Sequence, residues 1–198
     1  MTLSTRDRLN QIEQTIINDP FFGNRSLSSG NGGYIFDYDP EDEIVVRDFI
    51  RNFASRADLG FKIQAIDLFN DVLINFLKEE DYLESVFDLE EECRSLPEGI
   101  DYLKNAMSGL IQQGGDSDLF VNYISRVAEE GSVIFLYGVG KCHPFVRSHV
   151  IINNFNSKMN GVKTILFYPG TYNSEELRLF GTIPSENYYR SMVLVGRD

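Results

Sequence analysis

The segment Gly138-Val139-Gly140-Lys141 has the setting of a phosphate-binding loop, because an apolar stretch precedes it and a helical pattern follows it. A P-loop also needs a glycine five positions before the second glycine here and a hydroxyl residue directly after the lysine. Phe135 and Cys142 occupy those two positions. Pro144 removes an amide from the helical turn that would hold the phosphate. We therefore interpret the segment as a tight turn.

Arg147 and His149 fall in the first turns of a helix that the pattern predicts over 144–158. Cations oppose the helix dipole at this end unless a carboxylate or another anion meets them. The simpler interpretation is an ion pair of Arg147 with an acid such as Asp39 or Asp67. The alternative is a functional position, because residues that break a local rule concentrate at functional sites.

Acidic residues follow two of the predicted strands, and a lysine follows a third. Asp37 and Asp39 stand at the end of one strand, Asp67 at the end of the next, and Lys141 after another. Ligands of open parallel sheets bind beyond the carboxyl ends of the strands, so we expect a charged crevice there. A metal site formed by the three aspartates has weak support, because Asp39 before Pro40 also suits a helix N-cap.

Alternating strand and helix patterns position these residues. They predict an α/β fold of three layers, Rossmann-like, with a mostly parallel central sheet and a C-terminal antiparallel hairpin. We treat residues 1–198 as one domain with a helical insert at about 79–130, although these helices would equally serve as crossovers covering one face of the sheet. The predicted strands are 34–38, 61–66, 132–137, 163–168, 177–183 and 188–195, with a turn at 184–187 joining the last two. The predicted helices after the first two strands are 68–77, 82–94, 100–112, 119–129 and 144–158.

Charge is unevenly distributed along the 198 residues, which carry a net charge of −12. Residues 138–198 hold 7 basic and 4 acidic side chains, so this last third alone is positive. The overall charge weighs against direct nucleic-acid binding and against an anionic membrane surface. No apolar run reaches the roughly 20 residues of a membrane span. The two cysteines form no paired motif, which suits a reducing compartment, and we expect a cytoplasmic protein.

The last predicted strand begins with Asn187-Tyr188-Tyr189-Arg190. Tyr and Arg are the usual anchors of protein interfaces, so this segment is a candidate contact surface. Packing of the aromatic side chains along an edge strand explains the same residues equally well.

Four C-terminal motifs in order resemble the BrxB family of BREX bacteriophage-defence systems. They are the segments Pro144–His149, Phe167–Tyr172, Leu177–Gly181 and Asn187–Arg190. The opening Tyr38-Asp39-Pro40 with Glu43 and Arg47 also matches. The resemblance extends over nearly the whole chain, although the middle helical block matches only in its general helical character and carries none of the quoted motifs.

The resemblance implies an accessory protein of a multi-protein defence island. Such islands also encode a DNA methyltransferase, a large ATPase, a PglZ-type phosphatase-like protein and a small RNA-binding-like protein. No catalytic activity goes with the family, and we assign no catalytic residue, metal or cofactor. The expected role is that of a non-enzymatic subunit that binds another BREX protein, with the PglZ-type component as first choice and the hairpin and basic last third as contact surface.

The alternative is an enzyme or switch that binds a nucleotide or metal in the crevice at the strand ends. The candidate partner- or ligand-binding residues for the two hypotheses together are Asp39, Asp67, Lys141, Arg147, His149, Tyr172, Arg178, Tyr189 and Arg190.

Overall fold

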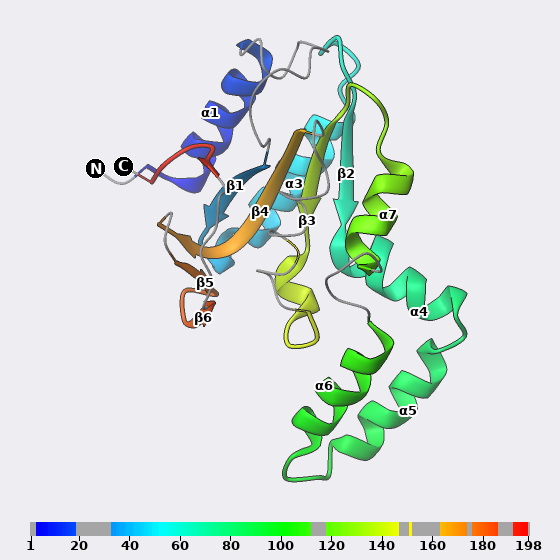
Figure 1. Ribbon diagram of the computed structural model, residues 1–198. Coiled ribbons are helices and arrows are strands. Elements are labelled where there is room, and N and C mark those ends of the chain that lie inside the picture. Colours follow the sequence, from blue (N-terminus) through cyan, green and yellow to red (C-terminus); the bar gives the residue numbers. More distant parts are fainter. Residues whose placement is uncertain are drawn as a thin grey trace.

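The fold belongs to the α/β class: a mixed β-sheet is flanked by helices, as Figure 1 shows for a computed structural model of the chain. The structure describes residues 3–18, 33–111, 118–146, 151, 163–173, 176–185 and 192–197. Five strands lie in the order β2-β3-β4-β1-β7, and each pair of neighbours is parallel. Their bounds are Gly33–Tyr38 for β1, Ile63–Asp67 for β2, Val133–Tyr137 for β3, Lys163–Tyr172 for β4 and Met192–Val193 for β7. The predicted fold class is confirmed.

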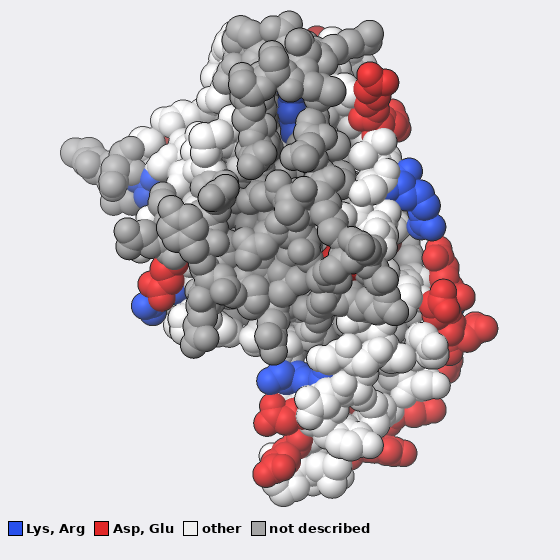
Figure 2. All heavy atoms as spheres, viewed as in Figure 1, with Lys and Arg blue, Asp and Glu red and all other residues white. Residues whose placement is uncertain are grey.

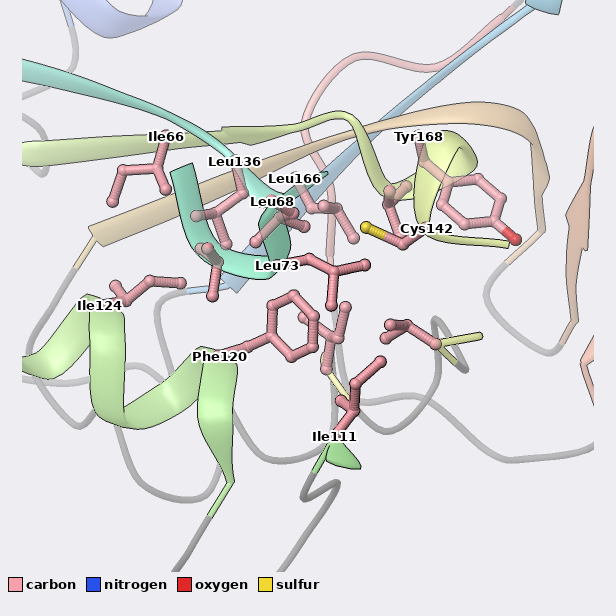
Figure 3. Close-up of a cluster of buried hydrophobic side chains, with 14 of the residues drawn as sticks. Ile66, Leu68, Leu73, Ile111, Phe120, Ile124, Leu136, Cys142, Leu166 and Tyr168 are labelled. Atoms are coloured by element: carbon pink, nitrogen blue, oxygen red, sulfur yellow. The ribbon is translucent and has the colours of Figure 1, made fainter. Parts of the chain in front are cut away.

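Successive side chains of the central strands enter two separate cores, one on each face of the sheet. Phe135 and Phe167 lie in one core with buried side chains of helices α1 (Thr5–Asn18) and α3 (Glu43–Ala54). Leu136 and Leu166 lie in the other, against α7 (Leu119–Val127) and the turns after β2 (Figure 3). Both faces are therefore covered, which is why β3 and β4 are apolar along nearly their whole length.

The helical segment after β2 differs from the single α-helix predicted over 68–77. It begins as a π-helix, η2 (Leu68–Ile74), and continues as the short helix α4 (Asn75–Glu79). Helices α5 (Leu83–Cys93) and α6 (Gly99–Leu110) follow and pack against each other. Together they form a helical hairpin that extends away from the sheet, whereas α7 returns to it (Figure 1).

Strand β4 runs through Pro169 and Gly170, although we expected these two residues to end it. Up to Pro169 the strand pairs with β1, and from Gly170 onward it pairs with β5 (Leu177–Leu179). Gly170 has a φ of 155°, and a Cβ there would lie 2.0 Å from the backbone oxygen of Arg178. A glycine is therefore required where the strand changes partners.

An antiparallel hairpin is present near the C-terminus, but it does not join the two strands that we predicted. The antiparallel hairpin joins β5 to β6 (Ile183–Ser185) through a turn in which Phe180 and Gly181 have positive φ. Those two residues interrupt the strand expected over 177–183. Strand β7 lies instead beside β1 and parallel to it.

The helix predicted from Pro144 does not begin there. Gly138 leads into a short 3-10 helix, η3 (Val139–Cys142), and residues 143–145 form a turn. The remainder of the predicted helix lies outside the described residues, except for Ile151. No helix in the described part of the chain has the length and apolar character needed to cross a membrane.

Candidate functional site

Two of the predicted crevice residues meet at the carboxyl ends of β2 and β3. The ammonium group of Lys141, on η3, lies 2.6 Å from Oδ2 of Asp67. Asp67 is the last residue of β2 and is buried. Parallel strands end at the same edge of the sheet, so the loop after β3 brings Lys141 to the end of β2.

Asp67 also holds the first turn of η2. Its Oδ1 accepts hydrogen bonds from the backbone amides of Phe69 (3.0 Å) and Asn70 (3.2 Å). The side-chain amide of Asn70 donates to Oδ2 at 2.8 Å. The carboxylate thus binds a lysine and caps a helix at once, which explains why a buried acid is tolerated here.

The turn predicted over 138–141 is confirmed, and its glycine has a specific purpose. Gly138 has a φ of 79°, in the left-handed region. A Cβ at this position would lie only 2.3 Å from Oδ1 of Asp67. Glycine therefore lets the backbone turn directly over the carboxylate and places Lys141 on it.

A second cation reaches Asp67 from helix α3. The guanidinium of Arg47 lies 3.8 Å from Oδ2 of Asp67 and 3.9 Å from Glu43. Glu43 in turn accepts a 2.5 Å hydrogen bond from the hydroxyl of Tyr38, at the end of β1. We call Tyr38, Glu43, Arg47, Asp67 and Lys141 the strand-end network. Arg147, for which we predicted an ion pair with an acid such as Asp39 or Asp67, lies outside the described residues, so that pair stays a prediction.

The surroundings shift the pKa values of three titratable groups beside this network. Burial raises the pKa of the Cys142 thiol to about 12, and the nearby charge of Asp67 contributes in the same direction. Burial also raises the pKa of Tyr137, with further contributions from Asp67 and Asp71. Partial burial and the charge of Lys104 lower the pKa of His143. In all three cases the shift of the pKa favours the neutral form of the side chain.

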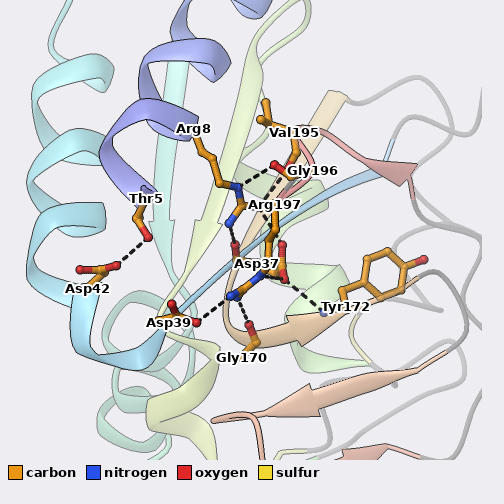
Figure 4. Close-up of polar contacts among 10 residues, drawn as sticks. All are labelled: Thr5, Arg8, Asp37, Asp39, Asp42, Gly170, Tyr172, Val195, Gly196 and Arg197. Atoms are coloured by element: carbon orange, nitrogen blue, oxygen red, sulfur yellow. Dashed lines mark hydrogen bonds and ion pairs between the residues drawn. The ribbon is translucent and has the colours of Figure 1, made fainter. Parts of the chain in front are cut away.

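A second polar cluster surrounds Asp37 on β1 (Figure 4). Arg8, on α1, is only 2% exposed and lies 2.8 Å from Oδ1 of Asp37. Its other hydrogen bonds go to the backbone oxygens of Asp37, Val195 and Gly196. A buried guanidinium needs this full set of acceptors, so Arg8 joins α1, β1 and the chain segment after β7.

Arg197 approaches the same carboxylate from the other side. It donates to Oδ2 of Asp37, to Oδ1 of Asp39 and to the backbone oxygen of Gly170, each at 2.7 Å. Asp39 stands at the N-cap position of the 3-10 helix η1 (Pro40–Asp42), as expected. Its side chain, however, makes no capping hydrogen bond. We call Arg8, Asp37, Asp39 and Arg197 the Asp37 cluster.

The three aspartates of the hypothetical metal site thus belong to two separate groups. Arg197 joins Asp37 to Asp39, whereas Asp67 belongs to the strand-end network. Among the residues that the structure describes, no group of three His, Cys, Asp or Glu side chains is arranged to hold a metal ion.

Comparison with known proteins identifies the family. The family described as "BREX protein BrxB" matches residues 64–194. A BREX protein BrxB of Bacillus cereus (strain H3081.97) is 36% identical over 193 residues, covering 96% of this chain and 97% of its own length. This chain belongs to the BrxB family. A second BREX protein BrxB, from Escherichia coli O9:H4 (strain HS), is 28% identical over 188 residues, which cover 95% of this chain and 90% of its own length. No solved structure matches the chain.

The resemblance that we drew from the sequence motifs is therefore confirmed, and BrxB proteins are components of BREX phage-defence systems. The family match at 64–194 includes Asp67 and Lys141 but begins after Arg8 and Asp37. The alignments with the two BrxB relatives, by contrast, extend over nearly the whole chain.

The remaining candidates lie at different places in the BrxB-family fold. Tyr172 is buried at the end of β4, and its amide donates to Asp37 at 3.3 Å. Arg178 lies on the exposed side of β5, paired with Glu176 at 3.0 Å. The partners named here, Asp37 and Glu176, lie outside the strand-end network. Four further candidates, His149, Arg147, Tyr189 and Arg190, lie outside the described residues.

Arg8 and Arg197 are the residues of the Asp37 cluster that sequence reasoning missed. For Arg8 a signal was available, because it lies in phase with the buried stripe of α1 formed by Thr5, Leu9, Ile12 and Ile16. A charged residue on the apolar face of a helix needs a buried counter-charge. Nothing comparable marks Arg197.

Proposed function

We propose that this protein is a non-enzymatic accessory subunit of a BREX phage-defence complex, acting in the bacterial cytoplasm by binding another BREX protein. Membership of the BrxB family supplies the BREX context. The observation that favours binding over catalysis is the internal pairing of the strand-end charges. Asp67 is held by Lys141, Asn70 and two backbone amides, so its oxygens already serve the fold.

The PglZ-type component is our first choice of partner, on the strength of the family resemblance. We propose the β5–β6 hairpin and the basic last third as one contact surface, in which Arg178 is exposed. Binding of acidic partner surfaces by a locally positive region would suit electrostatic steering.

The test is reconstitution. Each BREX protein of the same island is purified and mixed with this protein, and complexes are sought by size-exclusion chromatography at low and at physiological salt. We expect a stable complex with the PglZ-type component. The absence of a complex with every BREX protein, even at low salt, would refute the proposed function.

A second candidate function is ligand binding by the strand-end network. It is favoured by one observation: Lys141 and Arg47 both lie at the carboxyl edge of the sheet and keep 31% and 38% of their side chains exposed. Cations at this edge suit a nucleotide phosphate. A nucleotide at 100 times its Kd would stabilise the protein by about 2.7 kcal/mol. A thermal-shift series with nucleotides and divalent metals tests this, and unchanged melting temperatures throughout would exclude the ligands tried.

A further inference from the structure

The helical hairpin of α5 and α6 carries an unusual share of exposed apolar side chains. Nine large hydrophobic residues are exposed in the described part of the chain, and five of them lie between residues 82 and 102. They are Tyr82, Phe87, Leu96, Ile100 and Tyr102. Single exposed apolar residues need no explanation, but their concentration on one projecting element does.

The hairpin is anchored by a different set of side chains. Cys93, Leu103 and Met107 are buried and join the core that α7 also covers. The five exposed residues, by contrast, leave much of their apolar surface uncovered by the part of the chain that the structure describes.

Two of these residues line a hollow at the tip of the hairpin. Leu96 and Tyr102 are 53% and 60% exposed. With Pro97, Glu98, Asp101 and Asn105 they surround a space of about 440 Å³. The lining of the hollow combines apolar side chains with two carboxylates, one of which, Asp101, also makes an exposed pair with Lys104 at 3.2 Å.

The surroundings of the hollow are strongly acidic. Residues 79–101 contain ten acidic side chains and a single basic one, Arg94, which is itself paired with Glu90 and Glu91. Figure 2 shows Asp and Glu side chains along this projecting end of the molecule, with few Lys or Arg among them. Such a field attracts cations and repels other acidic surfaces.

This charge selects among possible occupants. A second copy would bring an equally acidic hairpin, and its net charge of −12 adds general repulsion. Nucleic acid would be repelled in the same way. A protein segment that offers Lys or Arg beside an apolar side chain complements both the acidic and the apolar residues that line the hollow.

We infer that the tip of the α5–α6 hairpin is a docking site for a basic segment of a BREX partner protein, with an apolar side chain of that segment seated between Leu96 and Tyr102. The inference rests on the proposed function, because it names a surface through which such a partner is held. It is separate from the contact proposed for the β5–β6 hairpin and the basic last third.

The experiment measures the Kd of each purified BREX protein of the island for wild type and two double variants. Leu96→Ala/Tyr102→Ala removes the two large apolar side chains of the lining, and Glu98→Lys/Asp101→Lys reverses the charge of its two carboxylates. We expect each to weaken the complex by about tenfold or more. The charge variant should also make the affinity less sensitive to salt.

Matched controls lie on α3, away from the hairpin. Ile44→Ala removes an apolar side chain that is 74% exposed, and Asp48→Lys reverses an exposed acid. Both should leave the Kd within about twofold of wild type. Circular dichroism melts of all variants verify that they fold, as expected for changes at exposed positions.

The outcomes separate this inference from the proposed function. A partner that binds wild type and both double variants equally well would refute the docking site while leaving the proposed function standing. Failure of every BREX protein to bind wild type would refute the proposed function and this inference with it. Self-association in sedimentation experiments that the Leu96→Ala/Tyr102→Ala variant abolishes would assign the tip to a second copy and overturn the inference.

Discussion

Asp37 is buried between two arginines that belong to distant parts of the chain. Arg8 reaches it from α1 and Arg197 from the segment after β7. Buried charge is tolerated here because each guanidinium also finds backbone oxygens as acceptors. Asp39 supplies the second negative charge, through its pair with Arg197, and Asp37 fixes three elements relative to each other.

Asp37→Ala should lower the free energy of unfolding by about 3–5 kcal/mol, because it leaves Arg8 buried without a counter-charge. Urea denaturation measures the change. The control is Asp48→Ala, which removes an exposed partner of Arg51 and should cost less than about 1 kcal/mol. Equal effects of the two substitutions would show that the buried pair contributes nothing special.

Substitutions at Gly138 and Gly60 distinguish the cost of backbone strain from the cost of a close atomic contact. Both have positive φ, but only at Gly138 would a Cβ meet Asp67; at Gly60 nothing lies within 4 Å. Gly60→Ala should cost about 1–2 kcal/mol from the left-handed conformation alone. Gly138→Ala should cost about 1–3 kcal/mol more, because the methyl group displaces the carboxylate. Similar losses in urea denaturation would argue against a tight contact over Asp67.

Cys142 makes stability depend on pH above neutrality. Its pKa rises from 9.0 to about 12 on folding, since the thiol is buried and lies near Asp67. The unfolded chain releases this proton at lower pH than the folded one, so stability is unaffected below pH 9 and falls as the pH rises from 9 toward 12. Between about pH 8 and about pH 10 the loss should be about 1 kcal/mol smaller in Cys142→Ala than in wild type. Parallel unfolding profiles for the two proteins would contradict this.

At the scale of elements, patterns along the sequence predicted most strands and helices but not their partners. The buried runs of β1, β3 and the first part of β4 were recognisable because both faces of these strands are covered. The strand after Lys163 continued past Pro169-Gly170 because β5 pairs with its far end, which no local signal announces. Likewise, the segment after β7 is held beside β1 by hydrogen bonds of the Asp37 cluster to Val195 and Arg197. These bonds join residues from nearly opposite ends of the sequence.

The candidate site was likewise predictable only in part. Asp67 and Lys141 were predictable, since the ends of parallel strands meet at one edge. That Arg47, and not a residue of the later helix, would also approach Asp67 depends on how α3 packs, which the sequence pattern does not specify.

Helix α7 begins at a capping residue that can be tested. The carboxylate of Asp118 is buried and accepts a hydrogen bond from the amide of Val121 at 2.9 Å. Asp118→Ala should reduce the free energy of unfolding by about 1–2 kcal/mol. Glu98 occupies the equivalent position of α6 without a capping hydrogen bond, so Glu98→Ala should be nearly neutral in the same urea measurement. A neutral Asp118→Ala would mean that the cap is dispensable.

At the scale of the whole molecule, we propose that the chain unfolds as one cooperative unit, because the two cores share the same central strands. Phe135 and Leu136 are neighbours whose side chains enter opposite cores. Phe135→Ala and Leu136→Ala should each cost about 2–5 kcal/mol and lower the same Tm. Circular dichroism and the fluorescence of the ten tyrosines, in a chain without tryptophan, should give coincident transitions. Two separated transitions would instead indicate two independent units.

The placement of β1 has a consequence for how the protein is made. This strand lies near the start of the chain, yet both of its neighbours come from much later segments, β4 and β7. During synthesis, β1 leaves the ribosome long before either neighbour exists. Its edge toward β4 stays unpaired until Pro169 has been made, and its edge toward β7 until translation has passed Val193. The nascent chain therefore carries an apolar, edge-like segment until β4 and then β7 have been made, and during this interval it is a segment for chaperones to shield.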